Sequence, residues 1–427
     1  MKSPKVRYRI LFVLCLMYFI SYIDRVNIAV AAPLIRKELG LTPIELGFVF
    51  SAFAYPYAAT QIFGGWLADR YGPRLMLTIL SLIWAGATIL TGFAGGVATL
   101  VLFRLIVGIG EGGAFPTATR AFASWTPVRE RGVARGVAQG SSRLGGALTP
   151  PIVLLIVAGY GWRAAFIVLG TVSALWTIVW LLSFTNTPQE HPRISQEELE
   201  DIGVYVPKLR HETTPWKPLI SRMWLVTFVD FCYGWSLWVF LTWLPSYLSD
   251  ARHFPLSQMA IMTMLPLMAG VFGDTVGGAS SDFIYARTGN LKLARRGVLV
   301  VGLLGAFTFI LPAVTTASPV AAVWYLSLAF FFLEVTNPIL WTLPLDIAAR
   351  YSGTAGGMMN TGFGIAGMIS PVVFGFLIQR TGSYQLPFFL SAALLLIGAV
   401  CALKIDPNRR VEEPAAAVAT AGVMIEG

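Results

Sequence analysis

Twelve long apolar runs dominate this 427-residue sequence and limit what it can fold into. Each is about 20 residues long or longer, which is the length at which an α-helix crosses the hydrocarbon core of a bilayer. Hydrophobic residues make up 56% of the chain and charged residues only 12%, about half the charge of a soluble domain. We therefore predict an all-α membrane protein with twelve transmembrane helices. The predicted spans are 10–31, 44–67, 75–93, 97–119, 133–157, 164–183, 223–248, 258–283, 297–315, 320–343, 356–378 and 385–404.

The formal charge of +9 is a topology signal. Most Lys and Arg residues lie in alternate connecting segments, beginning with the segment before the first span. By the positive-inside rule these segments face the cytoplasm, so both termini are predicted to be cytoplasmic. We expect no nucleic-acid partner. The basic residues of the opposite, outward loops are Arg36, Lys37, Arg163, Arg252 and Arg380.

One long polar segment, 184–222, divides the chain into two halves of six spans. We predict an N-terminal lobe over 1–183, a cytoplasmic linker over 184–222 that contains a short surface helix, and a C-terminal lobe over 223–404. Residues 405–427 are predicted to form a disordered cytoplasmic tail. The halves also resemble each other: the glycine pair and aspartate after the second span recur after the eighth span. Parallel repeats of this kind are typical of two-lobed transporters.

Residues that usually carry catalysis or bind metals are scattered. The three cysteines, Cys15, Cys232 and Cys401, fall in separate apolar runs, and the three histidines lie in separate polar connections. No spacing typical of a metal site, a nucleophile with its base, or a phosphate-binding loop is present in the sequence. We therefore expect a protein that is not an enzyme and that uses no cofactor and no metal.

The segment after the second span carries a specific motif. Residues 64–74 read Gly-Gly-Trp-Leu-Ala-Asp-Arg-Tyr-Gly-Pro-Arg, and this segment resembles the loop motif between spans 2 and 3 of the major facilitator superfamily. The resemblance implies two six-helix lobes and a conformational gate at this loop. A purely topological role for Arg70 and Arg74 is the alternative. The implied gating residues are Gly64, Gly65, Asp69, Arg70, Gly72 and Arg74, with Asp282 as the counterpart in the second half.

Spans 1 and 4 carry a narrower resemblance. Residues 22–29, 104–108, 111–113 and 115–116 are similar to the anion:cation symporter family, which includes bacterial hexonate, hexuronate, glucarate and tartrate symporters. The resemblance implies that Asp24 and Glu111 carry coupled protons. At Ser142 the alignment with the family is uncertain by one residue. The residues implied to contact substrate are Tyr22, Arg25, Tyr57, Arg104, Ser142 and Asn360.

Ionisable residues inside spans are costly, and we interpret them as functional. Arg104 and Glu111 are seven residues apart, so they share one helix face about 10.5 Å apart along the axis. Arginine guanidinium groups bind carboxylates in a bidentate manner, which suits an anion. The alternative is that Asp24 pairs with Arg104, or Arg25 with Glu111, merely to hold helices together. The full set of ionisable residues within spans is Asp24, Arg25, Arg104, Glu111, Arg143, Asp230, Asp274 and Glu334.

Four further charged residues are less defined by the sequence. Arg143 is left open between a cavity role and an interhelical pair. Asp230 and Glu334 are left open between lining a cavity or gate and packing helices, and Asp274 is expected to serve the gate. Trp341 shares a helix face with Asn337 and Glu334, so it is a candidate substrate contact. For a second group of tryptophans we expect anchoring at the membrane interface. These are Trp235, Trp238, Trp243 and Trp324.

These features together predict the function. We expect a multi-pass protein of the bacterial inner (plasma) membrane, monomeric, that imports a small organic anion by proton symport with alternating access. A sugar acid such as a hexonate, hexuronate or aldarate is the expected cargo. The alternatives are a drug/proton antiporter and a uniporter of the same fold. The sequence leaves open which anion is carried, the proton stoichiometry, whether another cation replaces the proton, and the oligomeric state.

Overall fold

The computed structural model describes residues 5–127, 131–202, 215–348, 352–409 and 411, and within these ranges every regular element is a helix. The elements are α1 (Val6–Leu39), α2 (Pro43–Ala52), α3 (Ala54–Tyr71), α4 (Pro73–Thr91), α5 (Val97–Trp125), α6 (Arg131–Ser183), η2 (Pro188–Glu190), α7 (Gln196–Ile202), α8 (Trp216–Ser246), η3 (Tyr247–Ala251), α9 (Leu256–Thr288), η4 (Leu293–Gly297), α10 (Val298–Thr315), α11 (Pro319–Val335), α12 (Asn337–Ile347), α13 (Ser352–Thr381) and α14 (Gln385–Ala402).

Ten stretches among the described residues are long and apolar enough to cross a membrane. Two features explain the difference from the twelve predicted spans. Helix α6 has 53 residues, which would make it about 80 Å long if it were straight. Its backbone departs from helical geometry at Gly161, where φ is 78°, a value that glycine adopts without steric cost. The second predicted span is divided at Phe53 into α2, which has 10 residues, and α3, whose 18 residues are too polar to be counted.

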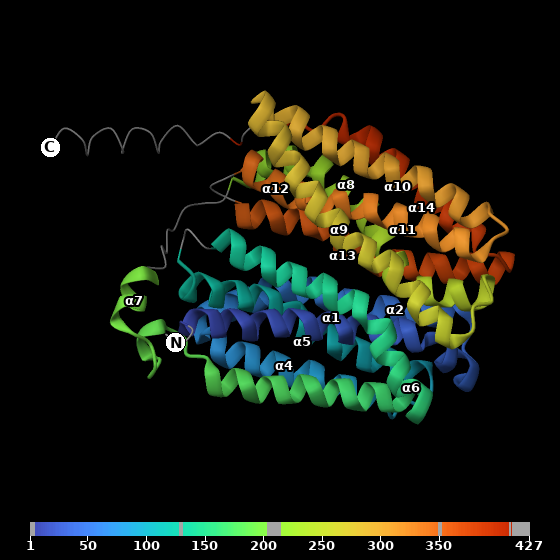
Figure 1. The fold of residues 1–427 in the computed structure, drawn as a ribbon, viewed down its shortest axis with the longest axis horizontal. Helices are drawn as coiled ribbons and strands as arrows, with labels where there is room; N and C mark the ends of the chain where they lie inside the picture. The colour runs from blue at the N-terminus through green and yellow to red at the C-terminus, as the bar shows by residue number, and fades with distance from the viewer. Residues whose placement is uncertain (1–4, 128–130, 203–214, 349–351, 410, 412–427) are drawn as a thin grey trace.

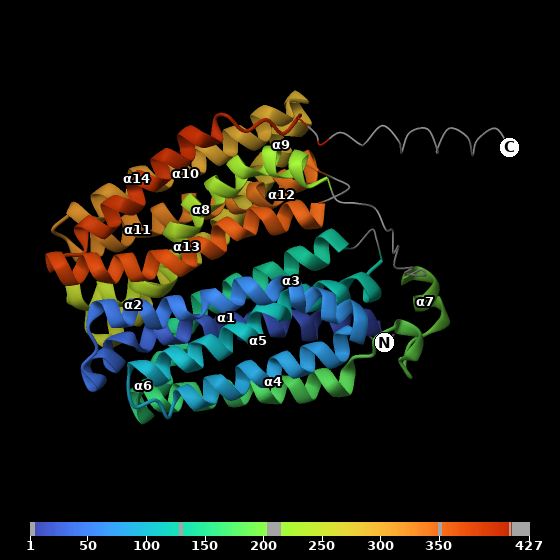
Figure 2. The same ribbon diagram turned by 180° about the vertical axis from the view of Figure 1, so that it is seen from behind.

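The helices form two bundles that lie side by side (Figure 1). Helices α1 to α6 make one bundle and α8 to α14 make the other. We call the end at which α1 begins, and near which α7 lies, the base of the molecule. Seen from behind, the two bundles diverge toward the base and approach each other at the opposite end (Figure 2).

The predicted surface helix in the linker is confirmed as α7. It packs at the start of α1, where the buried Glu198 carboxylate accepts hydrogen bonds from Val6 N at 3.0 Å and Arg7 N at 2.8 Å. A carboxylate at this position satisfies free amide groups and complements the positive end of the helix dipole. An ion pair between Arg7 and Asp201 adds a second contact. The linker is therefore fixed to the N-terminal bundle at this point.

The two bundles are joined at the end opposite the base. Arg36 at the end of α1 forms an ion pair with Asp250 of η3, and the Tyr384 hydroxyl donates to the same carboxylate at 3.1 Å. Helix α2 packs against α13 so closely that a Cβ atom on Gly47 would lie 2.6 Å from the Pro371 carbonyl oxygen. The contact requires glycine, because no larger residue permits this approach of the backbones.

The structure differs from the sequence-based expectation at two boundaries of the C-terminal half. Helix α8 begins at Trp216, seven residues before the predicted span at 223. Residues after α14 are also ordered at first: Ile405 is 3% exposed, and its carbonyl accepts two hydrogen bonds from Arg296. The rest of the predicted tail, residues 412–427, lies outside the described residues.

The interpretation of the tryptophans as interface anchors is wrong for three of them. Trp238 and Trp243 are almost fully buried, and Trp235 is 5% exposed. The Trp238 and Trp243 indole nitrogens donate to backbone carbonyls of α13, so both rings pack between helices and satisfy their polar atom there. Trp324 is exposed on the surface of the bundle.

Candidate functional site

Arg25 lies at the centre of a box of aromatic rings in the N-terminal bundle. Its side chain is buried, and its guanidinium lies 4.8 Å from the ring centre of Tyr22 and 4.7 Å from that of Tyr57. The Phe53 ring lies at 4.9 Å. Rings at this distance attract a cation through their negative faces. The box holds the arginine in one position between α1 and α3.

Glu111 neutralises this arginine. Arg25 donates to Glu111 Oε2 from Nη2 at 2.9 Å and from Nε at 3.2 Å, and the Glu111 side chain is inaccessible to solvent. Of the two pairings left open above, this one forms in the structure. Breaking a buried pair of this kind by removing one partner costs about 3–5 kcal/mol, so the pair also holds α1 against α5.

Arg104, on the same helix as Glu111, is differently placed. It is 3% exposed, and its guanidinium lies 4.8 Å from the ring centre of Phe53. Within the described part of the chain it makes neither an ion pair nor a hydrogen bond, and its Nε atom is buried without an acceptor. A buried guanidinium without a partner is costly. Arg104 therefore differs from Arg25 in having no carboxylate partner among the described residues.

Asp24 does not pair with Arg104. Its Oδ2 atom accepts a hydrogen bond from Ser173 of α6 at 2.5 Å, and the side chain is 2% exposed. The other carboxyl oxygen, Oδ1, has no hydrogen-bond partner, and neither does Glu111 Oε1. A buried carboxylate oxygen without a donor is unfavourable. Each carboxyl therefore has an oxygen on which a proton can reside.

A second buried ion pair joins the two bundles. Arg143 of α6 contacts Glu334 of α11 at 2.9 Å, and the Tyr233 hydroxyl of α8 lies 3.3 Å from the same carboxylate oxygen. Glu334 is fully buried. The sequence left the roles of Arg143 and Glu334 open, and in the structure they pair with each other across the two halves of the chain.

The two remaining acids bond within the C-terminal bundle. Asp230 Oδ2 accepts the amide of Phe363 at 3.2 Å, which links α8 to α13. Asp274 Oδ1 accepts the side-chain amide of Asn337 at 2.7 Å, which links α9 to α12. Both contacts give these carboxyl groups a role in holding helices together.

Three predicted substrate contacts lie apart from the Arg25 box. The Ser142 hydroxyl donates to Gln139 O of its own helix at 2.7 Å. The Asn360 amide donates to Gln61 Oε1 at 3.0 Å and so connects α13 with α3 of the other bundle. Trp341 on α12 is 45% exposed. No contact recorded among the described residues joins any of these side chains to Arg25 or Arg104.

Sequence reasoning missed the neutral residues of the site. Phe53 contacts both arginines, and Ser173 holds Asp24. Gln61 and Tyr233 contact Asn360 and Glu334 across helices. Serine is common in membrane helices, so nothing marks Ser173 in the sequence. For Phe53 the only signal is its spacing: it precedes Tyr57 by one helical turn and therefore shares its face.

The predicted gating motif lies at the base, where α3 meets α4. Gly64 packs against Gly113 of α5, so that a side chain at Gly64 would overlap the partner backbone. Gly72 joins the two helices. Arg74 bonds the end of α6, with Nη2 donating to Leu181 O at 2.7 Å. Arg70 is exposed.

In the other bundle, the Asp282 side chain is 81% exposed and lies 3.4 Å from Arg295. Arg295 also contacts Asp346 at 2.9 Å. The side chain of Asp69 and the surroundings of Gly65 lie outside the described residues.

Comparisons with known proteins bear on the family of this chain. The sequence model of the Major Facilitator Superfamily matches residues 14–371. The chain is 64% identical, over 96% of both proteins, to a probable sulfoacetate transporter of Cupriavidus necator. It is 33% identical to a D-galactonate transporter of Escherichia coli, over 93% of this chain and 95% of that protein. It is 30% identical to a hexuronate transporter of Bacillus subtilis, over 90% of this chain and 91% of that protein.

Solved structures share the fold. A bacterial homologue of the human lysosomal transporter Spinster, inward-facing and occupied, superimposes with a TM-score of 0.76 at 21% identity, over 97% of this chain and all of that one. A D-xylose–proton symporter superimposes with a TM-score of 0.75 at 14% identity, over 95% of this chain and 99% of that one.

Proposed function

Because the chain belongs to the Major Facilitator Superfamily and is an organic-anion transporter rather than an enzyme, we propose that it imports sulfoacetate, or a similarly short dianion, by proton symport. The observation that carries the proposal is the buried Arg104, which has no anionic partner within the described ranges and packs on the same Phe53 ring as the ion-paired Arg25. A small anion with hydrogen-bond acceptors at both ends would give the Arg104 guanidinium the acceptor that it lacks among the described residues. The 64% identity to a probable sulfoacetate transporter supports this cargo over a longer one.

The arginines support an anion over a cation. Arg25 and Arg104 are buried and Arg143 is partly buried, and among the described residues only Arg25 and Arg143 have carboxylate partners. A drug/proton antiporter that carries lipophilic cations would bring its cargo against an unneutralised guanidinium, which is electrostatically unfavourable. The antiporter alternative is therefore disfavoured.

Proton coupling is proposed from the carboxyl groups. Asp24 and Glu111 each keep one oxygen without a donor, and Glu111 competes with any incoming anion for Arg25. An anion that takes Arg25 would leave Glu111 buried and charged, and a proton removes that charge. Binding of the anion and of a proton would thus favour each other. A uniporter would have no need of this arrangement.

We propose that the base faces the cytoplasm of a bacterial cell, so that both termini are cytoplasmic and the chain crosses the inner membrane twelve times as a monomer. Residues 1–183 and 223–404 would form the two lobes, with 184–222 as the linker. In this orientation the structure is closed toward the outside by the contacts of Arg36 and Asp250, and its lobes diverge toward the cytoplasm. Alternating access would convert this arrangement into one that is closed toward the cytoplasm and open toward the outside. The seven motif residues named above, Gly64 to Arg74 and Asp282, would gate the exchange at the base.

Sugar acids are the second candidate, favoured by the relatives that carry galactonate and hexuronate. A hexonate offers one carboxylate and several hydroxyl groups. It would use Arg104 in the same way, with Tyr22, Tyr57 and Asn360 as hydrogen-bonding partners for hydroxyl groups. Ser142 and Trp341 are further candidates if the lobes move toward each other.

The test is transport by purified protein in liposomes with an acidic exterior. Labelled sulfoacetate should accumulate, and unlabelled sulfoacetate should compete better than D-galactonate or D-glucuronate. Arg104→Ala should abolish uptake, whereas Arg163→Ala, a change to an exposed arginine at the far end, should preserve it. Uptake of galactonate but not sulfoacetate would select the second candidate. Uptake of a lipophilic cation without any anion would refute both.

A further inference from the structure

A basic pocket lies at the base of the C-terminal bundle, away from the site described above. It is a cavity of about 290 Å³ between the start of α8, η4, the end of α12 and the segment after α14. Four cationic side chains line it, and one acid. Its charged residues are Arg222, Arg296, Lys404, Asp406 and Arg409.

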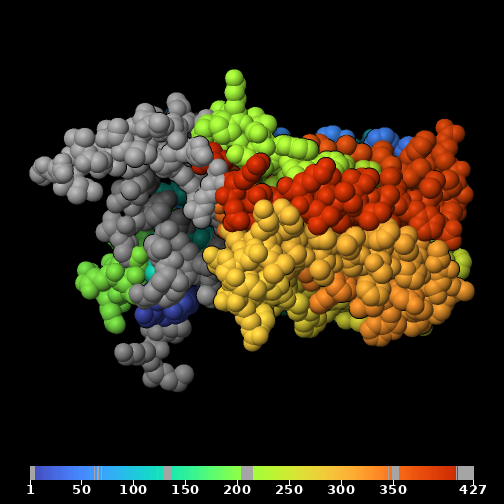
Figure 3. Space-filling model, turned by 90° about the horizontal axis from the view of Figure 1, so that it is seen from above, coloured from blue at the N-terminus to red at the C-terminus, as the bar shows by residue number. Residues whose placement is uncertain are grey.

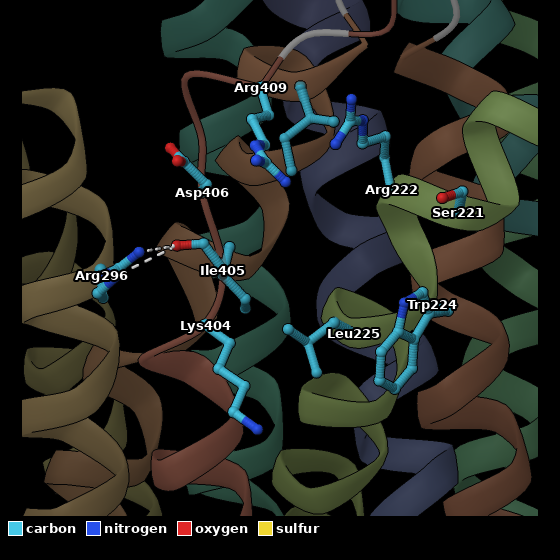
Figure 4. A pocket seen from close by; sticks show the side chains of 10 residues that line it. Ser221, Arg222, Trp224, Leu225, Arg296, Lys404, Ile405, Asp406 and Arg409 are labelled. Atoms are coloured by element: carbon cyan, nitrogen blue, oxygen red, sulfur yellow. Dashed lines mark hydrogen bonds between the residues drawn. The ribbon is translucent and has the colours of Figure 1, made fainter.

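Three of these cations have no anionic partner among the described residues. Arg222, Lys404 and Arg409 form neither ion pairs nor side-chain hydrogen bonds in the part of the chain that the structure describes. Figure 4 shows Arg222 and Arg409 at the same end of the pocket. Like charges gathered in one cavity repel each other, so an anion between them would be stabilised by all three.

The fourth cation, Arg296, builds the pocket. Its guanidinium donates to the Ile405 carbonyl from Nε at 3.0 Å and from Nη2 at 2.7 Å (Figure 4). A second bond, from Val411 N to Ile347 O at 2.8 Å, holds the end of the same segment to α12. The residues after α14 are thereby folded back, which carries Lys404 and Arg409 to the pocket.

Asp406, the acid in the lining, forms its ion pair with a residue outside the pocket. Asp406 pairs with Lys292 at 2.9 Å, and in Figure 4 its carboxylate points away from Arg222 and Arg409. The hydrogen bond from Lys292 holds the pKa of Asp406 below its usual value, so the carboxylate remains charged and engaged outside the cavity. The pocket keeps its excess of positive charge.

The surroundings of the pocket are apolar and exposed. Trp216, Ile220 and Trp224 follow each other at intervals of four residues along one face of α8, and all three are more than half exposed. On the other side, Val400 of α14 and Leu403 directly after it are each 53% exposed. Figure 3 shows the start of α8, in yellow-green, standing beside the red segment that follows α14. Exposed tryptophans are typical of the level of the lipid headgroups.

We propose that this pocket binds the phosphate of an anionic phospholipid from the leaflet at the base. The phosphate would lie between Arg222, Lys404 and Arg409, and the acyl chains would lie along Trp224 and Leu403. Basic pockets between membrane helices at the cytoplasmic side are suited to such headgroups. Free inorganic phosphate offers the same charge, but it would make no use of the apolar faces that flank the cavity.

The test measures lipid bound to the full-length protein by native mass spectrometry, with phosphatidylglycerol and phosphatidylcholine as probes. We expect preferential binding of phosphatidylglycerol, and at least a fivefold loss of it in Arg222→Gln/Arg409→Gln. The matched control is Arg193→Gln/Arg287→Gln, which removes two arginines outside the pocket; it should stay within twofold of the wild type. Should the double variant fail to fold, Lys404→Gln is measured in its place.

Three results would overturn the proposal. One is binding of phosphatidylcholine to the wild-type protein that equals binding of phosphatidylglycerol. Another is unchanged phosphatidylglycerol binding in the pocket variant. The third is thermal stabilisation by inorganic phosphate that matches stabilisation by phosphatidylglycerol, because this would identify the ligand as a free anion.

Discussion

Arg25 and Arg104 are both buried beside Phe53, yet they differ in what neutralises them. Arg25 has Glu111 and several ring faces, whereas Arg104 has only the Phe53 ring. The difference gives them different roles in the proposed transport cycle. Arg104 can bind an anion without losing a partner, and Arg25 can do so only when Glu111 is released.

Arg104→Lys keeps the charge but removes the planar fork that binds carboxylate or sulfonate through two hydrogen bonds. Loss of one charge-assisted hydrogen bond is worth about 1.5–3 kcal/mol, so the KM for uptake should rise about tenfold or more. Concentration series of initial uptake rates measure this. Arg163→Lys serves as the control and should leave KM unchanged. An unaltered KM in Arg104→Lys would remove Arg104 from the substrate site.

Asp24→Asn replaces the carboxyl that Ser173 holds with an amide of the same shape. If Asp24 carries a coupled proton, the variant should lose accumulation driven by a pH gradient while keeping exchange of labelled for unlabelled anion. Both are measured on the same liposomes, with the exposed Glu190→Gln as the control. Gradient-driven accumulation at the wild-type level would show that Asp24 is not a proton carrier.

Close helix packing is the main feature at the scale of the elements. Gly64 of α3 and Gly113 of α5 meet backbone to backbone, which is how small residues bring membrane helices together. Gly108 and Gly112 of α5 meet the backbones of Phe53 and Tyr57 in the same way. These close contacts hold the α2–α3 segment against α5, the helix of the candidate site.

Gly64→Ala should therefore destabilise the protein, because the added methyl group would overlap the Gly113 backbone and force α3 and α5 apart. Overpacking of this kind costs about 1–3 kcal/mol. Gly136→Ala is the matched control: it is also helical, but a Cβ atom there has nothing within 4 Å. Its effect should be neutral or stabilising. Thermal unfolding in detergent compares the two, and equal melting temperatures would contradict the packing argument.

For the whole molecule, several polar contacts join the two bundles. At the end opposite the base, Asp250 binds Arg36 of the other bundle and is also held by Tyr384 of its own. Nearer the middle, Arg143 binds Glu334, and Gln61 binds Asn360. If the lobes rock against each other, the outer contacts must open. The free energies of these contacts then set the equilibrium between the arrangement that is closed at this end and the arrangement that is open there.

Asp250→Asn weakens the outer contact by removing its charge while keeping its size. The population that is open at this end should increase. Spin labels at the exposed positions Lys37 and Gln385, one in each lobe, report the separation by pulsed electron resonance. In the variant, a longer distance between the two labels should appear, or the fraction of molecules at that distance should increase. The same pair of labels with Asp201→Asn, a change at the base, provides the comparison. Identical distance distributions in both variants would exclude Asp250 as part of the closure.

The described helices match the predicted spans closely because hydrophobic length is a local property. Spans of about 20 apolar residues must be helical in a bilayer, whatever they contact. The exceptions are informative. The division of the second span at Phe53 and the start of α8 at Trp216 depend on packing and on the linker, which hydropathy does not register.

The sequence by itself determined the fold class, the family and the costly charged residues, because each follows from composition, run length or motif. The tertiary structure decided which of those charges neutralise each other. Arg25 pairs with Glu111, Arg143 pairs with Glu334 across the lobes, and Arg104 keeps no partner among the described residues. Pairing depends on distances between helices that are far apart along the chain. For the same reason, the neutral partners Phe53 and Ser173 and the basic pocket at the base emerged only from the folded chain.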